Sequence, residues 1–217
     1  MRERRVFLKG LGAGLGLTGL SVLSGLYRIG IKTQDLGYAL GDPGPDVKAT
    51  LPRIEGQTAT LGQTEGPYYF PKSPLRRDVR ASGRGGADLV LRGRVLDPSG
   101  RPVAGAVIDM WQADENGNYD LHGYGYRGHQ FTDVDGRYEL MTVRPKAYRA
   151  LGIFRAPHIH FKLQGPETQM LTTQLYFPDE ITANGQDRLF DESLQVNLMG
   201  RDGSAQLARF DLVLEEA

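Results

Sequence analysis

The chain has 217 residues, a formal net charge of zero at pH 7 and no cysteine. The missing thiols exclude disulfide bonds, thiolate metal sites and cysteine nucleophiles, so any metal ligand has to be His, Tyr, Asp or Glu. The balanced charge gives no support for a nucleic-acid partner, and the length allows one domain with a hydrophobic core plus a tail.

The first 32 residues resemble a twin-arginine export signal. Arg4 and Arg5 are followed by Phe7-Leu8-Lys9, and a glycine-laced apolar run covers residues 10–26. This pattern predicts the twin-arginine translocase as a partner during export and a periplasmic or extracellular location. No clear Ala-x-Ala cleavage site follows, so an uncleaved membrane anchor stays open as the alternative.

Residues 33–63 are predicted to be a linker and residues 64–217 the folded domain. The linker is polar and contains Asp42-Pro43-Gly44-Pro45, which breaks any regular element. The domain opens with residues 64–71, Thr-Glu-Gly-Pro-Tyr-Tyr-Phe-Pro, which suit an irregular N-terminal arm laid over the rest. We interpret the arm's tyrosines as packing residues.

Short strands follow at regular intervals. Turn residues separate them, as in Asp97-Pro98-Ser99-Gly100 and Asp133-Val134-Asp135-Gly136. This spacing predicts an all-β fold, an antiparallel β-sandwich with long loops and no helical domain. The expected strands cover residues 89–96, 106–112, 136–143, 155–163, 171–177, 194–199 and 208–214.

The strand at residues 155–163 carries two of the chain's four histidines. Side chains alternate along a strand, so His158 and His160 share one face while Ile159 and Phe161 point to the other. Their Cα atoms would lie about 7 Å apart, which lets both imidazoles reach one metal ion. A pair of surface or hydrogen-bonded histidines in a β-sandwich is the alternative, but the pair beside an apolar face favours a metal site.

Two tyrosines are the next candidate ligands. Tyr119 follows the strand at 106–112 and Tyr148 follows the strand at 136–143, so each lies in a loop carried by the predicted sandwich. A phenolate oxygen is a hard, anionic donor that suits ferric iron. Any one of the ten tyrosines is more simply a packing residue, and that alternative weakens only when all four positions are considered together.

Further motifs connect these residues between Thr64 and Phe177. They are the arm at 64–69, Gly93-x-Val95, Gly105-Ala106, Trp111, Gly117-Asn118-Tyr119, the turn at 133–138, Arg155 to Phe161, and Thr172-Thr173-Gln174. With them the chain resembles the intradiol ring-cleavage dioxygenases, the family of catechol 1,2-dioxygenase and protocatechuate 3,4-dioxygenase. The strand with Arg155, His158 and His160, preceded by the two tyrosines in order, is the most specific part of the resemblance.

The resemblance implies Fe(III) as the cofactor, held by Tyr119, Tyr148, His158 and His160. It implies a small aromatic diol and O2 as the molecules acted on, and cleavage of the ring between its two hydroxyl-bearing carbons to give a muconate-type diacid. Tyr148 would also accept a substrate proton, Arg155 would stabilise charge beside the ring, and Gln174 would orient the substrate. A homo-oligomer and the identity of the diol stay open.

Some features depart from the family's pattern. Ala156 and Pro157 are exchanged relative to the usual Arg-Pro-Ala-His order, and only nine residues separate Tyr148 from His158. The turn at 133–138 and the strand near Gly93 also occur in transthyretin-like and carboxypeptidase-regulatory-like sandwich modules, which are not enzymes. An exported binding module of that kind is therefore one alternative, and a metalloprotein with another metal or reaction is the other.

Overall fold

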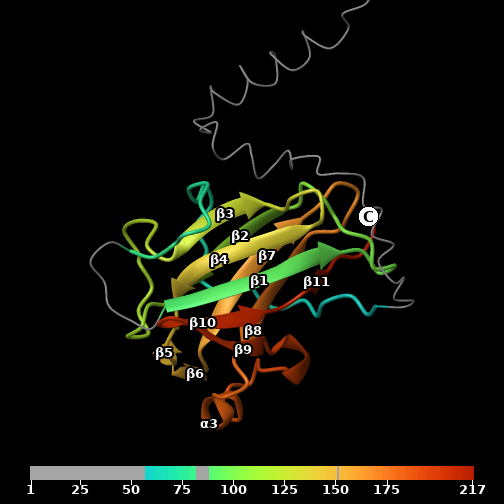
Figure 1. Ribbon diagram of the computed structural model, residues 1–217. Coiled ribbons are helices and arrows are strands. Elements are labelled where there is room, and N and C mark those ends of the chain that lie inside the picture. The colour runs from blue at the N-terminus through green and yellow to red at the C-terminus, as the bar shows by residue number, and fades with distance from the viewer. Residues whose placement is uncertain (1–56, 82–87, 151) are drawn as a thin grey trace, which may run out of the picture. The chain divides into compact units, whose positions relative to one another are not determined.

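The computed structural model describes residues 57–81, 88–150 and 152–217 (Figure 1). The predicted signal and the predicted linker up to residue 56 lie outside this part of the chain, so the division at residues 32 and 63 stays a prediction. None of the helices among the described residues is long and apolar enough to cross a lipid bilayer.

The described chain is almost entirely strand. In chain order the elements are β1 (Asp88–Leu96), β2 (Val107–Gln112), β3 (Arg127–Phe131), β4 (Arg137–Val143), β5 (Tyr148–Ala150), β6 (Ile153–Arg155), β7 (His158–Gln164), β8 (Leu171–Tyr176), the one-turn helix α3 (Ile181–Asn184), the 3-10 turn η1 (Glu192–Leu194), β9 (Asn197–Asp202), β10 (Ala205–Arg209) and β11 (Leu212–Val213). The predicted all-β class is confirmed.

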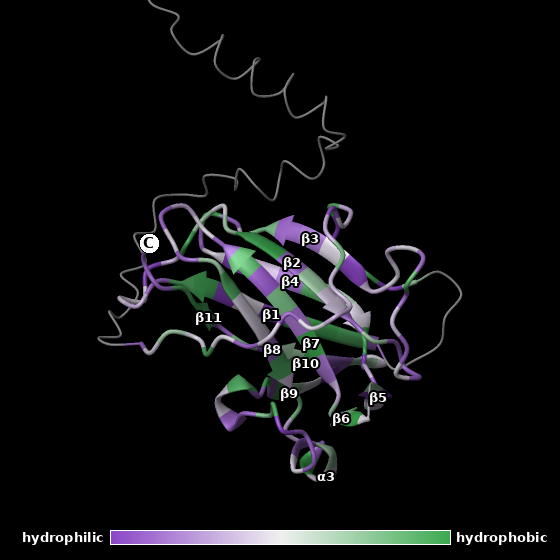
Figure 2. Cartoon of the chain, turned by 180° about the vertical axis from the view of Figure 1, so that it is seen from behind, coloured by the Kyte–Doolittle hydropathy of each residue, from purple (hydrophilic) through white to green (hydrophobic). Residues whose placement is uncertain are grey.

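Two sheets form the sandwich. One has the strand order β11-β1-β10-β9 with β4 on the other side of β1, and the second has the order β3-β2-β7-β8. Strands β5 and β6 form a separate hairpin, which lies with α3 at one end of the sandwich in both views (Figures 1 and 2). The pairings are antiparallel as predicted, except that β10 and β11 both run parallel to β1.

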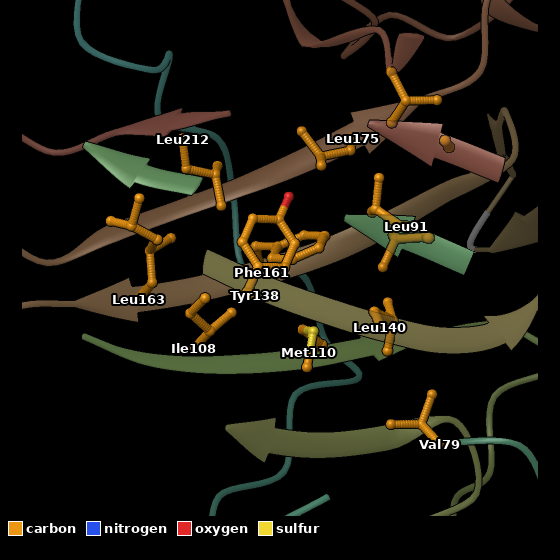
Figure 3. Close-up of a cluster of buried hydrophobic side chains, with 14 of the residues drawn as sticks. Val79, Leu91, Ile108, Met110, Tyr138, Leu140, Phe161, Leu163, Leu175 and Leu212 are labelled. Atoms are coloured by element: carbon orange, nitrogen blue, oxygen red, sulfur yellow. The ribbon is translucent and has the colours of Figure 1, made fainter. Parts of the chain in front are cut away.

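The core lies between the two sheets because alternate residues of each strand point inward. Leu89 and Leu91 from β1 and Ile159 and Phe161 from β7 are buried there. In the middle of the cluster the Tyr138 and Phe161 rings meet edge to face, with centroids 5.9 Å apart (Figure 3). Burying each such side chain contributes about 1.5–3 kcal/mol, and Figure 2 shows the hydrophobic residues gathered in the strands.

The prediction of one continuous strand over residues 208–214 is wrong. The strand divides at Phe210 and Asp211, where the chain passes from β10 to β11. The Phe210 carbonyl crosses closely over Gly93, since a Cβ added at Gly93 would lie 1.6 Å from that oxygen. The Tyr138 hydroxyl donates a hydrogen bond to the same carbonyl at 2.8 Å, which takes this residue out of the ladder.

The prediction of a strand over residues 194–199 is wrong at its start. Glu192–Leu194 form η1, which the Asp191 side chain caps by accepting a hydrogen bond from the Ser193 amide at 2.9 Å. Leu194 is buried in this turn, so its apolar character reflects packing of the turn and the strand β9 begins beyond it. The expected strand at 155–163 is divided, since Arg155 ends β6 and β7 begins at His158. The elements β3, β5 and α3 lie outside all the expected strands.

The two predicted turns are confirmed. The Asp97 side chain accepts hydrogen bonds from the backbone amides of Ser99 and Arg101, both at 2.9 Å. The Asp133 side chain accepts in the same way from Asp135 at 2.9 Å and Arg137 at 2.8 Å. Each aspartate thereby fixes the loop that aligns the strands on either side of it.

Residues 57–63, which the sequence analysis assigns to the linker, run along the sandwich. The Thr60 amide donates to the Val213 carbonyl at 3.0 Å, and the Gln63 amide donates to the Thr172 carbonyl at 2.7 Å. The chain is therefore already bound to both sheets where the arm begins. This attachment holds the arm over the face of β7 and β8 that points away from the core.

Candidate metal centre

His158 and His160 lie on the face of β7 that points away from the core. The residues between and after them, Ile159 and Phe161, belong to the core cluster, so the predicted alternation is confirmed. Both histidines are nevertheless buried, with exposed fractions of 2% and 1%, because the arm and the β5–β6 hairpin lie over this face. Strand β7 is an inner strand between β2 and β8, which fixes its register on both sides.

The two imidazoles converge through their Nε2 atoms, which are 3.1 Å apart. His158 Nδ1 lies 2.6 Å from the Ala156 carbonyl oxygen, so this nitrogen carries the proton and Nε2 keeps a free lone pair. Burial lowers the pKa of His158 to about 3, and burial together with neighbouring His158 lowers the pKa of His160 well below its ordinary value. Both rings are therefore neutral at neutral pH and available to a metal ion.

Neighbouring strands hold His160 in place. Trp111 of β2 and Gln174 of β8 are its direct partners across the sheet. The Trp111 ring stacks on the His160 ring, with centroids 4.7 Å apart and planes inclined by 7°. This stacking restricts the rotation of the imidazole and so fixes the direction of its lone pair.

Tyr119 is presented by a tight loop at the end of β2. The Asp114 side chain accepts hydrogen bonds from the backbone amides of Asn116 at 2.9 Å and Asn118 at 2.8 Å. Gly117 between them has φ +86°, in the left-handed region that favours glycine. The chain therefore turns sharply enough to bring Tyr119 back over the sheet.

The same glycine brings the two tyrosine loops together. A Cβ added at Gly117 would lie 2.7 Å from the Ala147 carbonyl oxygen and 3.3 Å from the Tyr148 Cβ. Only a residue without a side chain allows this approach. As a result the rings of Tyr119 and Tyr148 meet edge to face, with centroids 5.5 Å apart.

Tyr148 and Arg155 are direct partners across the β5–β6 hairpin. Directly opposed residues of an antiparallel pair project from the same face, so both side chains lie on one side of the hairpin. The Tyr148 ring lies 5.7 Å from the His158 ring. The hairpin thus adds a phenol and a guanidinium to the site beside the first histidine.

The structure brings all four predicted ligands together. The ring centroids of His158 and His160 are 4.8 Å apart, and the Tyr119 ring lies 6.3 Å from the His160 ring. Tyr148 adjoins both Tyr119 and His158, so the four aromatic side chains form one cluster in which each ring has two neighbours. These residues come from β7, from β5 and from the loop after β2.

The phenols of the site are protonated in the metal-free protein. Burial and the neighbouring Tyr148 raise the pKa of Tyr119 well above its ordinary value, and burial raises the pKa of Tyr148. The Tyr119 hydroxyl is buried and has no well-aligned hydrogen-bond partner among the described residues.

Arg155 and Gln174, the two predicted pocket residues, are in contact. Arg155 Nη2 donates to Gln174 Oε1, and Gln174 Nε2 donates to the Thr64 carbonyl of the arm at 2.8 Å. Their exposed fractions are 7% and 0%. Burial is the largest cause of the lowered pKa of His160, and the positive charge of Arg155 is a smaller one. The guanidinium therefore lies close enough to act on this imidazole.

Sequence analysis missed several residues of the site. Tyr68, interpreted as a packing residue, stacks on Tyr119 itself with centroids 4.3 Å apart and planes inclined by 19°. The Pro-Tyr-Tyr motif of the arm was the available signal for it. Tyr176 and Asp187 both contact Arg155, and Asp187 belongs to none of the motifs.

The other two histidines do not belong to this cluster of four rings. His129 Nδ1 lies 2.7 Å from the Ser73 carbonyl oxygen, and His122 is exposed. No group of three or more His, Cys, Asp or Glu side chains that could hold a metal ion occurs among the described residues. The donor set brought together here consists of two imidazoles and two phenols.

The β-sandwich thus brings two histidines and two tyrosines together at one site. The family model described as "Dioxygenase" (Dioxygenase_C) matches residues 64–216. The chain therefore belongs to this dioxygenase family.

Known relatives agree with this assignment. The chain is 33% identical over 138 residues to hydroxyquinol 1,2-dioxygenase of Rhizobium sp. (strain MTP-10005), covering 53% of this chain and 46% of that protein. It is 37% identical over 109 residues to the protocatechuate 3,4-dioxygenase beta chain of Burkholderia cepacia, covering 44% and 46%. The chain thus spans about half the length of the curated relatives it matches.

Solved structures show the same fold. The dioxygenase domain of a dioxygenase carbohydrate-binding protein fusion from Streptomyces sp. SirexAA-E is 42% identical, with a TM-score of 0.68 over 74% of this chain and 100% of that chain. Hydroxyquinol 1,2-dioxygenase from Pseudomonas putida DLL-E4 is 26% identical, with a TM-score of 0.66 over 76% and 69%.

Proposed function

We propose that this protein is an intradiol ring-cleavage dioxygenase. It uses O2 to cleave a catechol-type aromatic ring between its two hydroxyl-bearing carbons and forms a muconate-type diacid. The observation that carries this proposal is the cluster of four rings. The His158 and His160 Nε2 atoms are 3.1 Å apart, and each histidine ring has one of the two tyrosine rings beside it. The names of the relatives support the same reaction class.

We further propose that Tyr119, Tyr148, His158 and His160 hold Fe(III). The two imidazoles are neutral and need lose no proton, while the two phenols become anionic donors that favour the ferric state. The Tyr119 hydroxyl, buried beside the Tyr148 hydroxyl, fits a ligand atom. When bound, the ferric ion supplies a Lewis acid that orients the diol and lowers the pKa of its hydroxyl groups.

Tyr148 is proposed to act as the proton acceptor. Its ring lies 5.7 Å from the His158 ring, so its oxygen belongs to the cluster at which the diol would bind. The Tyr148 oxygen takes one proton from a substrate hydroxyl, which leaves the ring electron-rich for its reaction with O2.

Arg155 and Gln174 are proposed to act on the substrate. The buried guanidinium stabilises negative charge that develops beside the reacting ring, and it is effective because the site excludes water. The Gln174 amide is fixed by the arm through its hydrogen bond to the Thr64 carbonyl, so it orients a substrate oxygen. Tyr68 and Trp111 close the sides of the site and keep water out.

The alternative of a non-enzymatic transthyretin-like or carboxypeptidase-regulatory-like module is not favoured. Such a module needs only the sandwich, whereas here two buried imidazoles and two partly buried phenols lie together, and the matching family model is that of a dioxygenase. A metalloprotein with another metal is separated from the proposal by metal analysis of the purified protein.

The proposed function is tested with the purified protein after loading with Fe(III). Oxygen uptake is recorded with catechol, hydroxyquinol and protocatechuate, and His158→Ala treated in the same way is the control. We expect uptake of about one O2 per ring cleaved with at least one diol and none with the control. An iron-loaded, coloured protein that consumes no oxygen with any diol contradicts the proposal.

We also propose that the enzyme works outside the cytoplasm. Arg4 and Arg5, with the apolar run that follows them, support export through the twin-arginine translocase. This route carries folded proteins, so iron could be inserted before export. In this proposal residues 1–32 are the signal or anchor, residues 33–63 the linker, whose last residues already bond to both sheets, and residues 64–217 the enzyme domain.

A further inference from the structure

Asp187 is a fully buried carboxylate in the loop that follows α3, and its side chain has an exposed fraction of 0%. Its Oδ2 accepts hydrogen bonds from Arg155 Nε at 3.1 Å and from the Ala156 amide at 2.9 Å. Its Oδ1 accepts from the Leu189 amide at 2.9 Å. Every strong contact of this carboxylate is thus made to Arg155, to the residue after it, or to its own loop.

The other side of the Arg155 guanidinium is also held. Nη2 donates to Gln174 Oε1 and to the Tyr176 hydroxyl, the latter at 3.3 Å. No described residue accepts a hydrogen bond from Nη1. Two of the three nitrogens are therefore fixed by protein, and the third keeps its N–H donors for a ligand.

Asp187 also supports the first histidine through one peptide unit. It accepts from the Ala156 amide, while the Ala156 carbonyl binds His158 Nδ1 at 2.6 Å. Ala156 is itself fully buried, with an exposed fraction of 0%. One carboxylate thus holds the peptide that orients His158 and the guanidinium that precedes it.

We propose that Asp187 is a positioning residue that clamps the Nε edge of Arg155 so that Nη1 faces the bound substrate. This inference rests on the proposed function, because it assigns the guanidinium to the reacting ring. A flexible arginine is effective only if its planar head is held before the substrate arrives. The loop after α3, remote in sequence from the ligands, thereby becomes part of the active site's support.

The first test compares Asp187→Asn with Asp191→Asn. Both changes replace an acidic residue of the same loop by its amide, but Asp191 is exposed and only caps η1, a role that asparagine also fills. We expect Asp187→Asn to keep its iron and lower kcat by about 10- to 100-fold, while Asp191→Asn turns over normally. Normal turnover by Asp187→Asn overturns the positioning role and leaves the proposed function intact.

A double-mutant cycle separates positioning from general support of the fold. If Asp187 acts through Arg155, then adding Asp187→Asn to Arg155→Gln should lower kcat by no more than about twofold. A structural role alone would lower kcat by the same factor in both backgrounds, and that result would overturn the proposal.

The second measurement uses the wild-type protein and does not depend on activity. Hydrogen exchange of the Arg155 Nε–H group is followed by 15N NMR, with Arg155→Lys providing the assignment. We expect exchange at least about tenfold slower than at solvent-exposed arginines, because a buried carboxylate holds this proton.

Rapid exchange of this proton overturns the clamp, whether or not Asp187→Asn folds. If the wild-type protein cleaves no diol, the proposed function fails by itself. In that protein a protected Nε–H would still support the clamp, and an unprotected one would overturn it.

Discussion

His158 and His160 differ from the other ligand candidates because they need lose no proton to bind a metal. Burial depresses the pKa of both rings, and the Ala156 carbonyl fixes the tautomer of His158. Each imidazole is therefore ready to bind through Nε2. Removing either leaves three donors, which do not complete the site.

We therefore expect His158→Ala and His160→Ala to be colourless and nearly free of iron. The exposed His122 provides the control, and His122→Ala should bind as much iron as the wild type. Iron content is measured by elemental analysis after loading and gel filtration. Full iron content in either of the first two variants would place the metal elsewhere.

The tyrosines must lose protons that the metal-free protein retains. Burial raises the pKa of Tyr119 and of Tyr148, so both phenols are protonated at pH 7 and Fe(III) has to displace the protons. Because binding releases protons, iron affinity should rise with pH and weaken as the pH falls. We expect about two protons released per iron in an unbuffered titration.

Variants of the tyrosines sharpen this expectation. Tyr148→Phe should release about one proton fewer per iron, retain iron with a shifted visible band, and lose turnover. Tyr119→Phe should lose both iron and colour. If Tyr148→Phe releases as many protons as the wild type and turns over normally, the second phenolate comes from another tyrosine.

Single residues of the site were predictable where a local pattern encodes them. Alternation along one strand predicts that His158 and His160 share a face, and the resemblance to a family supplies Tyr119, Tyr148, Arg155 and Gln174. Asp187 and Tyr176 were not predictable, because their contacts with Arg155 arise only when distant segments pack together.

At the scale of elements, the site depends on two loops that approach within contact distance. Gly117 allows this approach, since a Cβ there would lie 2.7 Å from the Ala147 carbonyl oxygen. The loop carrying Tyr119 and the hairpin carrying Tyr148 are thus held in one fixed relation. Separating them would pull two donors apart while the sandwich stays folded.

Gly117→Ala should therefore weaken iron binding by at least about tenfold. Gly105→Ala is the matched control, because Gly105 also has positive φ, +70°, but no atom lies within 4 Å of a Cβ placed there. Both variants should lose about 1–2 kcal/mol of unfolding free energy from backbone strain. Equal iron affinities in the two variants would show that the close approach is not needed.

The elements were only partly predictable. Residues 89–96 and 171–177 have clear strand patterns bounded by turns, and both are strands. The strand β3, Arg-Gly-His-Gln-Phe, has no β-branched residue and forms because β2 provides its pairing partner. The strands of the hairpin β5–β6 are only three residues long and pair with each other alone. The break at Phe210 depends on a backbone crossing over Gly93, which no local pattern encodes.

At the scale of the whole molecule, the arginine pair should decide where the enzyme works. Replacing Arg4 and Arg5 together by lysine should leave the protein in the cytoplasm, because the export pathway reads the arginine pair. Cell fractionation followed by immunoblotting measures the outcome, and oxygen uptake with a diol checks that the retained protein is active. Unchanged export of the double variant would contradict the signal assignment.

In the proposed enzyme two phenolates, and no carboxylate, accompany the two histidines. An Fe(II) site of two histidines and one carboxylate activates dioxygen at the metal, and catechol-cleaving enzymes of that type open the ring beside the diol. Two phenolates favour the ferric state, so the substrate is the partner that becomes activated. The site of ring cleavage therefore reports directly on the donor set.

Product analysis in labelled dioxygen is the most direct measurement of this claim. The iron-loaded protein is supplied with a diol under 18O2, and the product is identified by mass spectrometry and visible absorption. We expect a colourless diacid that contains both labelled oxygen atoms, formed without added ferrous iron or reductant. A yellow semialdehyde product, or activity that requires ferrous iron and reductant, would contradict the intradiol reaction even if His158 and His160 prove to bind the metal.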